Sequence, residues 1–264
     1  MKYKTHRHRI ALICCCVATI MSGQAACIKS TTPSEPLPTV SSSDPNKVVD
    51  EILEKYTAAV GGKATIEQVK SYAGKGTLSS SLFKETGTFQ IWGKHPNKTL
   101  SVIRFPKGIV IKKGFDGETR WVQTPGGIRT DEGPGEMAEV ERDADIYSSG
   151  RIKNLYQSMR LEAIARLNGR DVKVVEGKPA KGPNEKLFFD SESGLLLRWD
   201  MVRKNPRRGN VFVKVSLDDY KDVDGIKVPF NVRFAFESFD LSMKIEELKH
   251  NVPLEDAMFH KPPH

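Results

Sequence analysis

The chain has 264 residues, 38% of them hydrophobic and 28% charged, with a formal net charge of +8. Four basic residues precede residue 10, so the part after Ala26 holds 37 basic and 33 acidic residues of interleaved sign, which argues against a nucleic-acid-binding protein. All four cysteines lie within the first 27 residues, which excludes a disulfide framework, a zinc ribbon and a thiol nucleophile from the rest of the chain.

Residues 1–26 have the order of a bacterial secretory signal, with basic residues, an apolar run from Ile10 to Met21 and then small residues. The run is shorter than the roughly 20 residues that span a bilayer. The end of this segment, Ala25-Ala26-Cys27, resembles a lipobox, in which the cysteine is acylated, although Gln24 replaces the usual aliphatic residue. Cleavage near Ala25 or Ala26 without acylation is the alternative.

The segment after Cys27 is rich in Ser, Thr and Pro from residue 30 to residue 44, a composition typical of a flexible tether. This tether favours lipidation of Cys27 over simple cleavage, because an anchored domain needs one. We therefore divide the chain into a signal peptide (1–26), a tether (27–43) and one domain (44–264).

The domain begins with an amphipathic helix, for which Asp44 is the expected N-cap, Pro45 the first residue and Gly61-Gly62 the end. A shorter helical piece is expected at 65–70. From Tyr72 to Thr130 the period becomes two, which indicates about five antiparallel strands, among them 86–92, 98–105, 109–115 and 118–124. Asp116-Gly117 predicts a type I′ hairpin turn, which needs positive φ at both residues.

After Pro134 apolar residues recur at spacings of three and four, which indicates two further helical stretches. They carry Met137, Val140, Ala144 and Tyr147, and then Ile152, Leu155, Tyr156 and Met159. Strands are expected again from about Leu161 and at 172–176, 186–190 and 195–202.

The last third alternates most regularly, in three runs that begin at Val211, Phe230 and Leu241. One face of each run is apolar and the other is mostly polar. Strands with one apolar face must pair with a second sheet or curl around something, and the amphipathic helices are candidates for the filling. We expect an α+β fold, a curled antiparallel half-barrel of about 11 strands with the N-terminal and central helices on its concave side.

This order of elements resembles the outer-membrane lipoprotein-sorting family, the periplasmic lipoprotein carrier and its outer-membrane receptor (LolA/LolB-like). The resemblance covers about Pro45 to Pro262. It rests on the leading helix, a meander that contains 114–121 (GFDGETRW), the helical interruption and the closing stretch 251–259 (NVPLEDAMF). It implies an unclosed half-barrel with a helical lid, no cofactor, and lipids or acyl chains as ligands.

Alternation selects nine apolar residues as the inward-facing lining that would contact such a ligand. They are Phe89, Ile91, Ile109, Ile111, Phe115, Leu187, Phe189, Leu197 and Trp199. An apolar groove holds an acyl chain by burying its methylenes, at about 0.8 kcal/mol each, and needs no catalytic group. We expect neither a cofactor nor a metal.

Two motifs admit a metal interpretation. The stretch 218–225 holds four aspartates before Gly225, but as an EF-hand loop it would place Asn231 where a glutamate is needed, so a hairpin turn is favoured. His250 and His260 could share a metal, which we do not favour. A third motif, 203–210, concentrates four basic residues at an expected hairpin tip; a solvated loop is favoured over contact with anionic headgroups.

The sequence as a whole favours a non-catalytic envelope protein that binds a lipid or an acylated protein, as a carrier or a receptor. We expect a periplasmic monomer, anchored in the outer membrane through Cys27, with no nucleic-acid partner. The main alternative is an interaction or sensory module of the same fold whose apolar face is filled by its own helices. A hydrolase with a carboxylate site is a weaker third, since no HExxH, GxSxG or P-loop pattern occurs.

Overall fold

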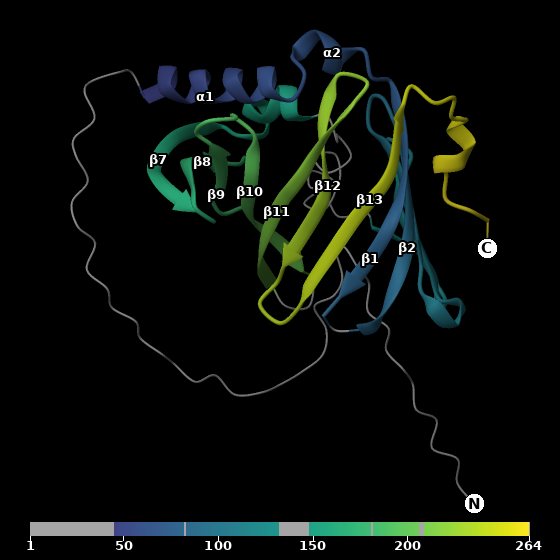
Figure 1. Cartoon of the computed structure of the whole chain (residues 1–264). Coiled ribbons are helices and arrows are strands. Elements are labelled where there is room, and N and C mark those ends of the chain that lie inside the picture. The colour runs from purple at the N-terminus through teal and green to yellow at the C-terminus, as the bar shows by residue number, and fades with distance from the viewer. Residues whose placement is uncertain (1–44, 82, 132–147, 181, 206–208, 264) are drawn as a thin grey trace, which may run out of the picture.

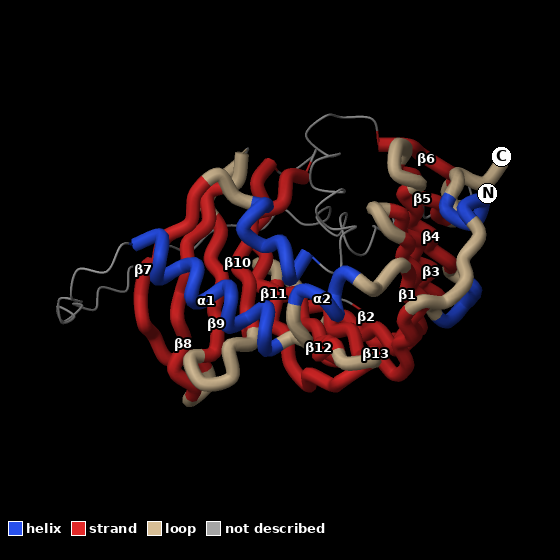
Figure 2. The backbone as a smooth tube through the Cα atoms, turned by 90° about the horizontal axis from the view of Figure 1, so that it is seen from above, coloured by secondary structure: helices blue, strands red, loops and turns tan. Residues whose placement is uncertain are grey.

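The computed structural model describes residues 45–81, 83–131, 148–180, 182–205 and 209–263, and its main feature is a single sheet of thirteen antiparallel strands (Figure 1). The strand order is β6-β5-β4-β3-β2-β1-β13-β12-β11-β10-β9-β8-β7, so among the described residues β6 and β7 are the two outermost strands and the sheet is open. Figure 2 shows that the sheet curls. The prediction of a curled open antiparallel sheet is confirmed, whereas the expected number of about eleven strands was too low.

The strands fall into two blocks. The first comprises β1 (Ser71–Ser80), β2 (Phe83–Lys94), β3 (Lys98–Arg104), β4 (Val110–Phe115), β5 (Arg120–Thr124) and β6 (Gly127–Asp131). The second comprises β7 (Ser158–Leu167), β8 (Arg170–Lys178), β9 (Glu185–Asp190), β10 (Leu196–Asn205), β11 (Gly209–Val223), β12 (Ile226–Ala235) and β13 (Asp240–His250). Within each block consecutive strands are neighbours, so both blocks are meanders.

The pairing of β1 with β13 joins the two blocks in the middle of the sheet. Tyr72 lies opposite His250 and Ser80 lies opposite Leu241, with a bulge between Lys75 and Gly76. The first and last strands of the domain therefore form its centre, and the two edges belong to strands from the middle of the sequence.

Helix α1 (Pro45–Ala59) lies across β7–β10 in Figure 2 and follows the predicted helix closely. Its apolar stripe is buried, as Val49 and Ile52 show with 2% and 4% exposure. Gly61 ends it with φ of +126°, and a Cβ there would lie 2.3 Å from the carbonyl oxygen of Gly225, so only glycine fits. Helix α2 (Lys63–Glu67) follows, close to the predicted position.

The central helices differ from the prediction. The stretch with Met137, Val140, Ala144 and Tyr147 lies outside the described residues. The second stretch is a 3₁₀ segment, η2 (Ser148–Leu155), and Met159 belongs to strand β7 instead. Helical spacing of apolar residues over a short stretch is compatible with a single turn followed by a strand, which explains the error.

The C-terminal segment ends in the short 3₁₀ element η3 (Asp256–Phe259), beside the first block of strands (Figure 1). Phe259 is completely buried, and its carbonyl oxygen accepts a hydrogen bond of 2.8 Å from Trp121 Nε1. Lys94 and Lys98 both contact the carboxylate of Asp256 and lower its pKa to about 2. The last helix-like turn is therefore fastened to the sheet by one buried and two charged contacts.

None of the helices in the described part of the chain has the length and apolar character that crossing a membrane would need.

Candidate functional site

The candidate site is the sheet face that α1 covers, which we call the inner face. The apolar stripe of α1 and residues from β1–β5, β8–β10, β12 and β13 form one buried cluster there, and partly buried residues of β11 pack against it. Tyr56 of α1 meets Phe189 of β9 edge to face, with ring centroids 5.4 Å apart. A second, smaller cluster of Met201, Val213 and Val215 lies on β10 and β11.

Strand pairing arranges the inner face in rows that cross the sheet. One row runs through Leu187, Trp199, Val215, Phe234 and Leu241. A second runs through Leu217, Val232, Met243 and Leu78. A third runs through Ile245, Gly76, Phe89, Ile103 and Ile111. Rows of mostly apolar residues thus extend over both blocks of strands.

The structure places seven of the nine predicted lining residues in or against the large inner-face cluster. They are Phe89, Ile91, Ile109, Ile111, Leu187, Phe189 and Trp199. Four of these, Phe89, Ile111, Leu187 and Phe189, are at most 2% exposed, so the protein's own side chains already cover them. Ile91, Ile109 and Trp199 are half-buried and retain surface for a ligand.

The two remaining predicted residues lie elsewhere. Phe115 is buried, with 1% exposure, but lies outside the cluster. Leu197 falls in a bulge between Leu196 and Arg198, so Leu196 takes the position opposite Phe189 and packs into the cluster instead. The expected inward orientation of Leu197 was wrong, because strict alternation does not hold across a bulge.

The half-buried residues that the prediction missed come from β11, β12 and β13. Leu217, Val232, Phe234, Met243 and Leu248 all pack against the buried clusters and remain partly exposed. Their signal was present in the sequence, because these strands show the most regular alternation. The surface that a ligand could contact therefore lies more on the second block of strands than the nine residues indicated.

A buried carboxylate stands on this apolar face. Glu185, at the start of β9, is 2% exposed, and its Oε2 accepts hydrogen bonds from the Tyr156 hydroxyl at 2.8 Å and from Trp199 Nε1 at 3.0 Å. Gly177 lies opposite Glu185 on β8, and a Cβ there would come within 2.6 Å of the Tyr156 ring. These contacts fix the orientation of the Trp199 ring on the inner face.

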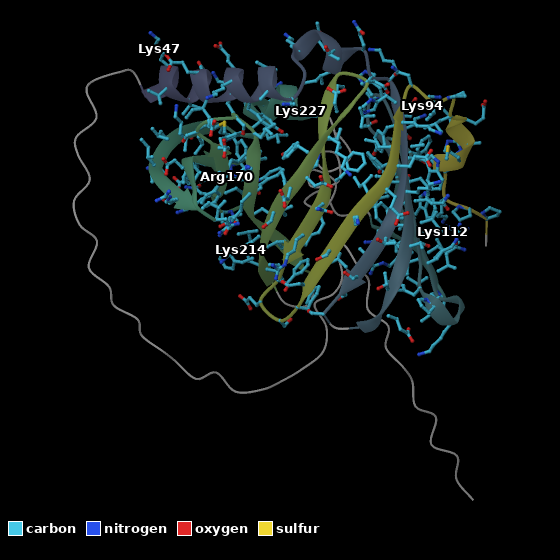
Figure 3. All side chains as sticks on the ribbon, viewed as in Figure 1. Lys47, Lys94, Lys112, Arg170, Lys214 and Lys227 are labelled. Carbon is cyan, nitrogen blue, oxygen red and sulfur yellow. The ribbon has the colours of Figure 1, made fainter. Side chains whose placement is uncertain are left out.

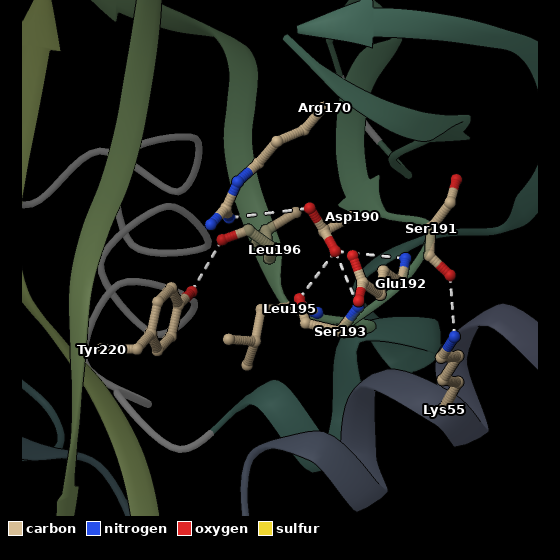
Figure 4. A network of polar contacts seen from close by, with 9 residues as sticks. All are labelled: Lys55, Arg170, Asp190, Ser191, Glu192, Ser193, Leu195, Leu196 and Tyr220. Carbon is tan, nitrogen blue, oxygen red and sulfur yellow. Dashed lines mark hydrogen bonds and ion pairs between the residues drawn. The ribbon is translucent and has the colours of Figure 1, made fainter. Parts of the chain in front are cut away.

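Polar contacts around the β9–β10 turn attach α1 to the sheet (Figure 4). The buried carboxylate of Asp190 accepts hydrogen bonds from the backbone and hydroxyl of Ser193, and Arg170 lies 3.6 Å away. Burial raises the pKa of Asp190, but these hydrogen bonds and Arg170 lower it more, so the pKa is below its ordinary value. The turn so held presents the carbonyl oxygen of Ser191 to Lys55 of α1 at 2.7 Å.

The bulge in β10 has its own support in Figure 4, where the Tyr220 hydroxyl donates a hydrogen bond of 2.7 Å to the carbonyl oxygen of Leu196. Burial, and then the neighbouring Tyr56, raise the pKa of Tyr220 well above 10.0, so the hydroxyl remains a donor. The register that places Leu196 rather than Leu197 on the inner face is therefore set by a contact with β11.

The suspected metal motifs form other structures. Asp224 and Gly225 have φ of +53° and +80° between the paired residues Val223 and Ile226, as the favoured two-residue hairpin turn requires. His250 is buried with Nδ1 3.3 Å from Asp224 Oδ2, whereas His260 is exposed. Across the described ranges, no three His, Cys, Asp or Glu side chains are grouped to hold a metal ion.

The sequence matches no protein-family model and no curated protein. Among solved structures, a DUF1329 family protein from Desulfovibrio piger has a TM-score of 0.55 and 17% identity, over 83% of this chain and 98% of that one. A LolA superfamily protein from Nitrosomonas europaea has a TM-score of 0.55 and 13% identity, over 80% and 97%. An outer membrane lipoprotein-sorting protein domain from Vibrio parahaemolyticus has a TM-score of 0.51 and 10% identity, over 81% of this chain and 94% of that one.

These identities are low, so the likeness is one of fold. It agrees with the open sheet, the leading helix and the apolar inner face described above. The chain therefore has the fold of the LolA superfamily, as its resemblance to the lipoprotein-sorting proteins predicted.

Proposed function

We propose that the protein binds a lipid or a protein-linked acyl chain on its inner face, without catalysis, as a carrier or receptor of the cell envelope. The observation that carries this proposal is the set of half-buried apolar side chains in the middle of the inner face. Leu217, Val232 and Met243 are neighbours across three strands, and each keeps part of its surface exposed. Apolar surface of this kind gains about 0.8 kcal/mol for each methylene that it buries.

The comparisons support the same proposal, because the solved structures with this fold include a LolA superfamily protein and an outer membrane lipoprotein-sorting protein domain. The sequence adds an N-terminal segment that resembles a secretory signal followed by Cys27. We infer an exported protein whose Cys27 is acylated, which would hold the domain at a membrane through the tether 27–43. Labelling with a fatty-acid probe tests the anchor, and unchanged labelling of a Cys27→Ala variant would contradict it.

The alternative is a protein-interaction module of the same fold that has no lipid ligand. It is favoured by the complete burial of Phe89, Leu187 and Phe189, since much of the inner face is covered by the protein's own side chains. The two functions differ in whether the exposed part of the inner face binds a lipid or an acyl chain.

Organic extraction of the purified protein, followed by mass spectrometry, separates the two. A carrier or receptor yields about one lipid or acyl chain for each protein molecule. An extract without lipid, together with a stoichiometric partner protein in a pull-down, would support the interaction module and contradict the proposal.

A further inference from the structure

One row of the inner face changes from apolar to basic as it crosses the sheet. Strand pairing continues this row from β13 to β6, and its members in order are Leu248, Gly74, Ile91, Ser101, Lys113, Val122 and Arg129. The members on β13, β1 and β2 are apolar. The members on β3–β6 bring a hydroxyl group and two positive charges, so the row has an apolar half and a basic half.

The apolar half offers a continuous surface for an acyl chain. Leu248 and Ile91 are half-buried and pack against the inner-face cluster. Both side chains lean over Gly74, since a Cβ there would lie 2.9 Å from Leu248 Cδ1 and 3.1 Å from Ile91 Cγ1. Neighbouring strands are about 4.8 Å apart, so the path along the sheet from Leu248 on β13 to Lys113 on β4 is about 19 Å. An extended myristoyl chain is of comparable length.

Lys113 lies on the inner face although it is charged. It is opposite Val122, which is 1% exposed and belongs to the inner-face cluster, and the side chains of directly paired residues leave a sheet on the same face. Its neighbours at the inner positions of β4, Ile111 and Phe115, are also buried. Lys112 alternates with it and in Figure 3 lies on the side of the C-terminal end of the chain, which is the outer face. Buried apolar neighbours strengthen the attraction between Lys113 and an anion, because they lower the local dielectric constant.

A second cation joins Lys113 from the strand at the end of the row. Arg129 of β6 lies opposite Val122 from the other side, so the two basic residues flank one buried apolar residue. Strands β3, β4 and β5 contain no acidic residue. Asp131 of β6 is in register with Arg120, in the next row. The row that contains Lys113 and Arg129 is therefore basic by register.

We propose that the ligand of the inner face is an amphiphile with an anionic headgroup. Ser101, Lys113 and Arg129 hold the headgroup, and the chain lies over Ile91 and Leu248. The headgroup accepts a hydrogen bond from the Ser101 hydroxyl and charge-assisted hydrogen bonds from the two cations. Carboxylates and phosphates share this chemistry, and the attached chain distinguishes the ligand from a free anion. The inference rests on the proposed function and deepens it, because it names the class of lipid that the inner face selects.

The test is calorimetric titration of the delipidated chain with two lysolipids that share a myristoyl chain, lysophosphatidylglycerol and lysophosphatidylcholine. The chain carries Cys27→Ala in every sample, so that an acyl group there cannot compete. We expect the anionic lysophosphatidylglycerol to bind about tenfold more tightly than the zwitterionic lysophosphatidylcholine. Lys113→Gln lowers the affinity for lysophosphatidylglycerol about tenfold and leaves the affinity for lysophosphatidylcholine unchanged. Inorganic phosphate does not displace either lipid; displacement by it would indicate a site for a free anion and overturn the inference.

The matched control is Lys112→Gln, because Lys112 is also half-buried and is the neighbour of Lys113 on the outer face. It should change neither affinity. Arg129→Gln, at an exposed position, is a second variant that leaves the fold intact and lowers the affinity for lysophosphatidylglycerol about threefold. Equal losses for Lys113→Gln and Lys112→Gln, or equal affinities of the two lipids for the chain with Lys113, would overturn the inference and leave the proposed function standing. If neither lipid binds, the proposed function fails as well.

Discussion

Filling the uncovered part of the inner face with a larger side chain should exclude a ligand without unfolding the protein. Val232→Phe is the change of choice, because Val232 lies between Leu217 and Met243 and is half-buried. The new ring adds about four carbon atoms, and displacing about four methylenes of a bound chain costs about 3 kcal/mol at about 0.8 kcal/mol each. The affinity for an acyl chain should therefore fall about 100-fold.

The assay is a titration with fluorophore-labelled palmitate, together with urea unfolding of the delipidated protein. Asn231→Phe is the matched control, because its side chain leaves β12 on the outer face and should not change affinity. If the protein's own side chains already filled this space, Val232→Phe would overpack it and lower the free energy of unfolding by about 1–3 kcal/mol. That loss, with unchanged palmitate binding, would refute the reasoning.

Two further predictions concern buried titratable groups. Glu185→Ala leaves the Tyr156 hydroxyl and Trp199 Nε1 without this acceptor, and we expect urea unfolding to show a loss of about 3 kcal/mol, which a surface substitution would not cause. Burial lowers the pKa of His250 below 6.5 despite Asp224, so the unfolded chain binds the proton more readily and the free energy of unfolding falls as the pH drops through 6.5. The measurement is the free energy of unfolding in urea, from about one pH unit below 6.5 to about one above it. His250→Gln should remove this part of its pH dependence, and an unchanged slope of the free energy against pH would contradict the assignment to His250.

Much of the fold follows from local patterns in the sequence. The stripe of α1 and its end at Gly61 are set by residues within the helix and by one close approach of backbone. The Asp224-Gly225 turn has the positive φ values that its residue types favour. At Asp116-Gly117 the turn is present, but it is not of type I′, because only Gly117 has positive φ. The Asp116 carboxylate accepts hydrogen bonds from the backbone N–H groups of Glu118 and Thr119.

The errors lie where contacts distant in sequence decide the structure. Leu197 leaves the inner face because of a bulge that Tyr220, 24 residues away, supports through the carbonyl oxygen of Leu196. Glu185 would be expected at the surface by its charge, yet hydrogen-bond donors from Tyr156, which follows η2, and from Trp199 of β10 make its burial acceptable. The full burial of Phe89 depends on packing that alternation does not contain.

The most direct test of a guest on the inner face uses Trp199, the one tryptophan of the three that lies there. Trp121 is on the other side of the sheet, where its Nε1 donates a hydrogen bond to the carbonyl oxygen of Phe259. Trp92 follows the inner-facing Ile91 on β2, so alternation places it on the outer face. In a chain with Trp92 and Trp121 both changed to Phe, a fatty acid brominated along its chain should quench Trp199 emission in proportion to bound ligand, and unbrominated palmitate should reverse the quenching. Saturable binding that leaves Trp199 emission unchanged would place the ligand elsewhere and contradict the account.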